Sequence, residues 1–135
     1  MDTNHEKHER HENLLYPEER YAIQGAVFDV YRYMGSGFLE AVYQECLEEE
    51  FKRRDIPYTT QDELQLFYKG TALKQFYKSD FICYGKIILE LKAVRVLLPE
   101  HEAQMLNYLK ATGMRLGLLI NFASHPKATI KPLIL

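Results

Sequence analysis

The sequence predicts a small α/β domain in which three helices flank a mixed β-sheet. Apolar residues recur at helical spacing in residues 17–34, in the segment that follows Gly37, and in residues 99–112. Runs rich in Ile, Val, Leu and aromatic residues lie between the second and third of these segments, and again after Gly113. The predicted order is therefore two helices, three strands, a helix and a strand, with a further strand in residues 129–135.

Length and composition indicate one domain, which we expect to occupy residues 17–135 of the 135-residue chain. Residues 1–16 are rich in His and Glu without apolar periodicity, so we expect a flexible tail, with adventitious transition-metal binding as the alternative. No stretch approaches the roughly 18 consecutive apolar residues of a membrane span, and the first residues do not form a signal peptide. We therefore expect a cytoplasmic protein without a membrane partner, in which Cys46 and Cys83 are reduced thiols.

The first two helices are separated by a glycine-rich turn. Pro17 suits the first turn of a helix, and Gly35 ends the apolar stripe that follows it. Gly37 leads into the second helix, where Glu40 and Tyr43 are three residues apart and so share a side. A glutamate in a first turn is commonly explained by the helix dipole alone, and an aromatic residue on a helix stripe is usually part of the core.

The strands are predicted from β-branched and aromatic runs that are separated by turn residues. Residues 64–68, 72–84 and 86–96 read as three strands of an antiparallel meander. The turns between them fall at Lys69-Gly70 and at Tyr84-Gly85.

Two charged residues interrupt the last strand of this meander. Alternation places Glu90 and Lys92 on one side of an otherwise apolar strand. If the preceding turn centres on Gly85, Asp80 lies opposite Glu90. Two carboxylates and an ammonium group then converge, and Mg²⁺ is commonly held by one or two carboxylates together with water and substrate phosphate. The pattern favours a phosphodiester-cleaving site.

The third helix and the segment after it complete the predicted domain. Pro99 opens the helix and Gly113 ends it, and Gln104 and Tyr108 share a face because they are four residues apart. These two polar groups could simply lie at the edge of the apolar face. Residues 116–122 then form a short apolar strand.

Charge is distributed unevenly along the chain. Residues 1–66 hold 7 Lys/Arg and 15 Asp/Glu, a net charge of −8, whereas residues 67–135 hold 10 and 4, a net charge of +6, and the two sum to the overall −2. The basic half contains the predicted site, as a phosphate-binding face requires. The alternative is a fringe of solvated lysines that protects sheet edges.

The spacing from Asp80 to Glu90-Leu-Lys92 resembles the catalytic core of the PD-(D/E)XK nuclease superfamily. The surrounding chain resembles its small GxxExxY family, whose motif is matched by Gly37-Phe-Leu-Glu40-Ala-Val-Tyr43. Further matches, in family order and together spanning residues 18–135, are Gly35-Ser-Gly37-Phe-Leu-Glu40, Tyr77-Lys-Ser-Asp80, Glu90-Leu-Lys92-Ala93, His101-Glu-Ala-Gln104 and Gly117-Leu-Leu-Ile-Asn121-Phe122. One departure is Tyr31, where relatives usually carry His.

The resemblance implies a PD-(D/E)XK-like fold and a metal-dependent nuclease that hydrolyses DNA or RNA, with Mg²⁺ or Mn²⁺ as the cofactor. It implies that Asp80 and Glu90 bind the metal and that Glu40, from an N-terminal helix, completes the site. Lys92 would then stabilise charge or activate water.

The resemblance also implies that the helix after the catalytic strand supplies polar groups beside the lysine, a role that we assign to Gln104 and Tyr108. The implied partner is nucleic acid. The resemblance to nickase-like and junction-cleaving members of the superfamily further implies a homodimer, or another partner, that holds the substrate. No separate DNA-reading module is visible in so short a chain.

Two alternatives to a nuclease remain open. The first is a non-catalytic binding or assembly module that keeps the fold, which the net negative charge and the lack of a recognition helix favour. The second makes Glu90 and Lys92 a structural ion pair, with Asp80 incidental. The presence of all three charges argues against the first alternative, because a buried charge without partners or metal is costly.

Overall fold

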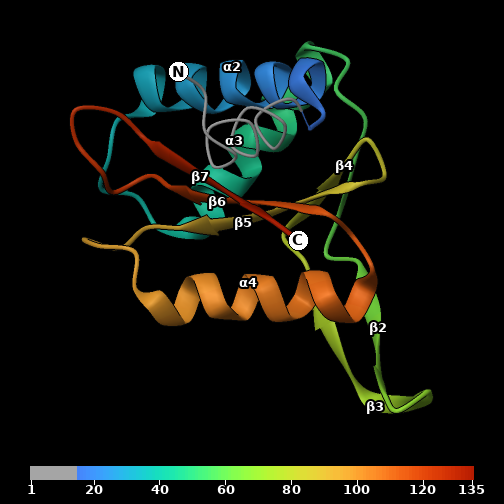
Figure 1. Ribbon diagram of the computed structural model, residues 1–135. Coiled ribbons are helices and arrows are strands. Elements are labelled where there is room, and N and C mark those ends of the chain that lie inside the picture. The colour runs from blue at the N-terminus through green and yellow to red at the C-terminus, as the bar shows by residue number, and fades with distance from the viewer. Residues whose placement is uncertain (1–14) are drawn as a thin grey trace, which may run out of the picture.

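The computed structural model describes residues 15–135 and shows helices packed on both faces of a β-sheet (Figure 1). The helices are α2 (Pro17–Met34), α3 (Glu40–Arg53) and α4 (Pro99–Thr112). The strands are β1 (Tyr58–Thr60), β2 (Glu63–Tyr68), β3 (Thr71–Lys78), β4 (Phe81–Cys83), β5 (Ile87–Lys92), β6 (Leu116–Asn121) and β7 (Thr129–Ile134). The predicted α/β fold class is confirmed, including the additional C-terminal strand. Of the predicted tail, residues 1–14 lie outside the described residues.

Five of the strands form a mixed sheet in the order β1-β4-β5-β6-β7. β5 and β6 are parallel, and the other neighbours are antiparallel. Helix α4 provides the crossover that a parallel pair requires. β5 occupies the centre of the sheet, which explains why its sequence is almost continuously apolar.

The two faces of the sheet are covered by different helices (Figure 1). Ile87, Leu89 and Leu91 belong to the core that includes residues of α2 and α3, whereas Ile88 packs with residues of α4. Strand alternation places Glu90 and Lys92 on the same side of β5 as Ile88, as predicted, and the packing of Ile88 shows that this is the α4 side.

The chain leaves one sheet for another just before Asp80. β2 and β3 pair only with each other, in a two-stranded antiparallel sheet, whereas β4 and β5 pair within the five-stranded sheet. The predicted strand over residues 72–84 is thus two strands that are interrupted at Ser79 and Asp80, and the predicted meander is divided between two sheets. At the break, the Ser79 N–H donates to the Asp62 carbonyl rather than continuing a ladder.

β5 also ends earlier than the predicted residue 96. The Asn121 side chain hydrogen-bonds both the N–H and the carbonyl of Val94, at 3.1 and 2.8 Å, and so occupies the groups that a longer ladder would use. No helix in residues 15–135 has the length and apolar character needed to cross a membrane. Cys46 and Cys83 are free thiols.

Candidate active site

Asp80 and Glu90 are brought opposite each other by a tight turn. Tyr84 and Gly85 both have positive φ, of 56° and 68°, as a type I′ turn requires. The register of β4 and β5 pairs residues whose numbers sum to 170, as predicted, and its continuation sets Asp80 against Glu90. Asp80 Oδ2 accepts the N–H of Leu91 at 2.8 Å, a hydrogen bond that fixes this carboxylate beside the end of β5.

Glu90 is largely enclosed and is held by a tyrosine. The Tyr77 hydroxyl donates to Glu90 Oε1. Burial raises the pKa of Glu90 to about 7; the Asp80 N–H and the Lys92 ammonium oppose this rise, and the Glu40 carboxylate adds to it. Such a pKa means that the fold holds a carboxylate where its charge is poorly solvated.

Asp80 shares the same electrostatic environment. Burial raises its pKa; the Leu91 N–H opposes this rise, the charge of Glu40 adds to it, and Lys92 opposes it. The two other charged residues predicted for the site, Glu40 and Lys92, thus act on both half-buried carboxylates. Lys92 is half-buried and forms no ion pair or side-chain hydrogen bond with any residue in 15–135. The structure brings these four side chains into one neighbourhood.

Glu40 reaches the site because the turn before α3 is rigidly built. It is the first residue of α3, and its Oε1 accepts the N–H of Ala93, just beyond β5, at 3.3 Å. The buried Tyr43 hydroxyl donates to the Gly35 carbonyl at 2.6 Å. Gly37 has φ of 109°, which favours glycine. Tyr43 and Gly37 therefore fix the backbone that positions Glu40. Neither residue contributes a charged group to the site.

Gln104 and Tyr108 are linked to Glu90 and not to Lys92. Gln104 Nε2 donates to the Tyr108 hydroxyl at 3.4 Å, and neither side chain hydrogen-bonds Lys92. The Tyr108 ring stacks on Tyr77, with ring centroids 3.6 Å apart and planes at 11°. Gln104, Tyr108 and Tyr77 thus form a chain of contacts that ends at the Glu90 carboxylate.

Tyr77 is the site residue that sequence reasoning missed as a functional group. It lies on β3, outside the five-stranded sheet, and it reaches Glu90 only because the hairpin folds against α4. Its place three residues before Asp80 in a family motif was the signal that could have identified it.

The donor set fits a hard divalent cation. Asp80 and Glu90 offer carboxylate oxygens that no ion pair within residues 15–135 neutralises. Mg²⁺ takes oxygen ligands, commonly one or two carboxylates, and keeps several waters or substrate phosphate oxygens. No group of three or more His, Cys, Asp or Glu side chains in the described part of the chain is arranged to hold a metal on its own. The residues therefore match an ion whose coordination is completed by water and substrate.

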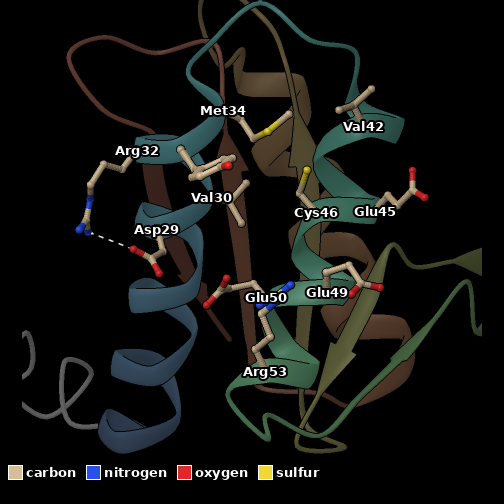
Figure 2. Close-up of a pocket in the computed structure, with 11 residues that line it drawn as sticks. Asp29, Val30, Arg32, Met34, Val42, Glu45, Cys46, Glu49, Glu50 and Arg53 are labelled. Atoms are coloured by element: carbon tan, nitrogen blue, oxygen red, sulfur yellow. Dashed lines mark ion pairs between the residues drawn. The ribbon is translucent and has the colours of Figure 1, made fainter.

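A separate pocket lies between α2 and α3 and has a volume of about 670 Å³ (Figure 2). None of the four charged site residues lines it. Its charged lining consists of four acids and two arginines: Asp29, Glu45, Glu49, Glu50, Arg32 and Arg53. This net negative lining is unsuited to a phosphate-bearing ligand.

Comparison with known proteins agrees with this architecture. The profile of one protein family, described as the PD-(D/E)XK nuclease superfamily, matches residues 17–133. Among solved structures, the crystal structure of SSO0001 is similar, with a TM-score of 0.55 at 20% sequence identity. The similarity covers 70% of this chain and 48% of that one, so this chain spans about half the length of SSO0001, and the likeness concerns the fold alone. No curated protein matches the chain. The narrower resemblance to the GxxExxY family stays a prediction.

Proposed function

Because the chain belongs to the PD-(D/E)XK nuclease superfamily, we propose that it is a metal-dependent nuclease that hydrolyses phosphodiester bonds of DNA or RNA. The observation that carries this proposal is the convergence of two half-buried carboxylates, Asp80 and Glu90, with an ammonium group, Lys92, that forms no ion pair within residues 15–135. A purely structural Glu90–Lys92 ion pair would bring those two groups into direct contact, and no such contact is present in residues 15–135.

Each residue of the site has a role in the proposed reaction. Asp80 and Glu90 would hold Mg²⁺ or Mn²⁺, with water and substrate phosphate completing the coordination. The exposed Glu40, at the start of α3, acts on both carboxylates through its charge but, among the described residues, does not complete a three-residue metal cluster with them. When bound, the ion supplies Lewis-acid polarisation of the phosphate and lowers the pKa of water. Lys92 stabilises the negative charge that develops on the phosphoryl oxygens.

Tyr77 is a positioning residue in this scheme. Its hydroxyl donates to Oε1 of Glu90, so it orients the carboxylate, and the second oxygen would be left for the metal. Tyr108 holds the Tyr77 ring by stacking, and Gln104 in turn holds the Tyr108 hydroxyl. Both therefore act on the metal site through Glu90 rather than through Lys92.

Calorimetric titration with Mg²⁺ tests the metal site without any assumption about substrate. Mg²⁺ is preferable to a softer ion because the His-rich N-terminal residues are poor ligands for it. We expect Asp80→Asn and Glu90→Gln to abolish binding, while Glu45→Gln, which changes an exposed carboxylate on α3, leaves binding unchanged.

Cleavage of labelled single- and double-stranded DNA and RNA tests the reaction. Lys92→Met is expected to keep Mg²⁺ binding and to lower the cleavage rate by roughly 10²- to 10³-fold, the usual loss for one charge-stabilising group. Lys110→Met, on the exposed side of α4, is the matched control. If wild-type protein binds Mg²⁺ neither alone nor with oligonucleotide, the nuclease assignment is wrong and a binding or assembly module takes its place.

A further inference from the structure

The β2–β3 hairpin projects from the body of the protein beyond α4 (Figure 1). It forms its own two-stranded sheet, and Tyr77 is the one residue of β3 that is buried. A two-stranded hairpin is marginal on its own, so its contact with α4 and the Tyr77–Tyr108 stack hold it in place.

The hairpin has two chemically different faces. Leu64, Leu66 and Tyr77 alternate on the face that packs with α4. The opposite face, here called the outward face, carries three cross-strand pairs: Glu63 with Lys78, Gln65 with Phe76, and Phe67 with Ala72. Lys74 lies beside this face, where the register shifts between Gln65 and Phe67. All of these side chains are exposed.

The aromatic rings of the outward face have no structural partner. Phe67 is 56% exposed and Phe76 is 48% exposed. Their cross-strand neighbours are Ala72 and Gln65, so the rings do not stabilise the hairpin as an aromatic pair. Within residues 15–135, neither ring contacts another ring. Two exposed phenylalanines on one face are therefore available for a ligand.

The hairpin is also basic. Residues 63–78 contain Lys69, Lys74 and Lys78 and a single acid, Glu63, a net charge of +2 in a chain whose net charge is −2. Lys69 Nζ lies over the Tyr68 ring, 5.5 Å from its centroid, whereas Lys74 and Lys78 form no ion pair or cation–π contact with a described residue. Aromatic rings interleaved with lysines match the way in which proteins bind single-stranded nucleic acid, with bases stacked on the rings and phosphates on the basic groups.

We propose that the outward face of the β2–β3 hairpin binds the unpaired nucleotides of a single-stranded substrate and delivers the strand to the candidate active site. A duplex is disfavoured as the ligand, because its bases are stacked inside the helix and offer the rings no free face. Phe76 and Lys78 lie near the end of β3, and Asp80 follows Phe76 by four residues, directly after the break between the two sheets. This inference rests on the proposed nuclease function.

Fluorescence anisotropy of a labelled 15-nucleotide oligo(dT), in EDTA to prevent cleavage, tests the hairpin directly. We expect Phe67→Leu/Phe76→Leu to weaken binding by tenfold or more, because leucine keeps the apolar surface and loses the stacking. Lys74→Ala/Lys78→Ala is expected to reduce the slope of log K against log salt by about 1.4, the value for two lost phosphate contacts on a single strand. Tyr33→Leu, at a 91% exposed ring on α2, is the matched control and leaves binding unchanged.

The outcomes separate this inference from the nuclease assignment. Asp80→Asn is expected to bind oligo(dT) as wild type does while losing any cleavage. If wild-type protein cleaves nucleic acid and the hairpin variants bind and cleave normally, the hairpin inference fails and the nuclease stands. If the hairpin variants lose binding but wild type cleaves nothing with Mg²⁺, the hairpin inference stands and the nuclease fails. Three results would each overturn the hairpin inference. The first is equal affinity for duplex and single strand, and the second is no binding of oligo(dT) by the wild-type protein. The third is a wild-type protein dimer that dissociates in the Phe67→Leu/Phe76→Leu variant.

Discussion

Glu90→Gln is expected to make the metal-free protein more stable and to make it unable to bind Mg²⁺. Burial raises the pKa of Glu90 from 4.5 to about 7. Since one pKa unit corresponds to 1.36 kcal/mol, the ionised carboxylate lowers the free energy of unfolding by about 3 kcal/mol at pH 8. Glutamine has nearly the same shape and still accepts from Tyr77, so it removes the charge and preserves the contact.

The sign of the pH dependence follows from proton binding. Between pH 4.5 and 7 the folded protein keeps the Glu90 proton and the unfolded chain does not, so the free energy of unfolding falls as the pH rises through this window. Above pH 7 the penalty is complete. The stabilisation of Glu90→Gln over wild type should therefore be small near pH 4.5 and reach about 3 kcal/mol at pH 8.

Urea unfolding in EDTA at pH 4.5, 6, 7 and 8 measures this difference. Glu45→Gln, an exposed carboxylate on α3, serves as the control and should show no comparable growth with pH. Saturating Mg²⁺ should stabilise wild type at pH 8, by about 2.7 kcal/mol at a concentration of 100 Kd, and leave Glu90→Gln unchanged. A difference between wild type and variant that is constant across the pH range would refute the argument that burial of the Glu90 charge destabilises the apo protein.

Three further predictions concern hydroxyl and thiol groups. Tyr77→Phe removes the donor to Glu90 and should weaken Mg²⁺ binding in calorimetry by roughly 10- to 100-fold. Tyr43→Phe removes a buried hydroxyl that bridges the turn before α3, and it should lower the free energy of urea unfolding by about 1–2 kcal/mol. Burial raises the pKa of Cys83 to about 12, so in the folded protein at pH 8 iodoacetamide should label Cys46, in the α2–α3 pocket, and leave Cys83 unmodified, as read by mass spectrometry.

One control variant serves the two tyrosine predictions, and each of the three predictions has a result that would contradict it. Tyr33→Phe alters a hydroxyl on a 91% exposed side chain and should change neither Mg²⁺ affinity nor stability. Unchanged Mg²⁺ affinity in Tyr77→Phe would show that the hydroxyl does not position Glu90. Labelling of Cys83 at the rate of the urea-unfolded chain would contradict its burial. If Tyr43→Phe is as stable as wild type, the Tyr43 hydroxyl does not stabilise the turn that positions Glu40.

The pairing of Asp80 with Glu90 could be predicted from the sequence because it depends on local rules. A turn of three residues, 84–86, pairs Cys83 with Ile87 and so fixes the register, and the two-residue period of a strand fixes the face. The orientation of Lys92 follows from the same alternation. Three of the charged groups were therefore accessible to reasoning over a span of thirteen residues.

The remaining contacts depend on packing between distant segments. Glu40 meets the backbone of Ala93 across 53 positions, and Tyr77 meets Tyr108 only where the hairpin rests on α4. The break at Ser79 was missed because the composition of residues 72–84 suits a continuous strand. That break is decided by which sheet each half joins, and local propensity carries no information about this choice.

The same break helps to explain how Asp80 and Glu90 are held close together without an ion pair among the described residues. A continuous ladder would use its N–H groups between strands; here the ladder is interrupted, and backbone donors act on side chains instead. Asp80 accepts from Leu91, Glu90 is stabilised by the N–H of Asp80, and Glu40 accepts from Ala93. These neutral dipoles orient the carboxylates but do not cancel their charge, so the pKa of Asp80 and of Glu90 remains raised. Lys92 lowers the pKa of both carboxylates through its charge but forms no ion pair with them, so its ammonium group stays available for substrate, and the remaining negative charge favours a divalent cation.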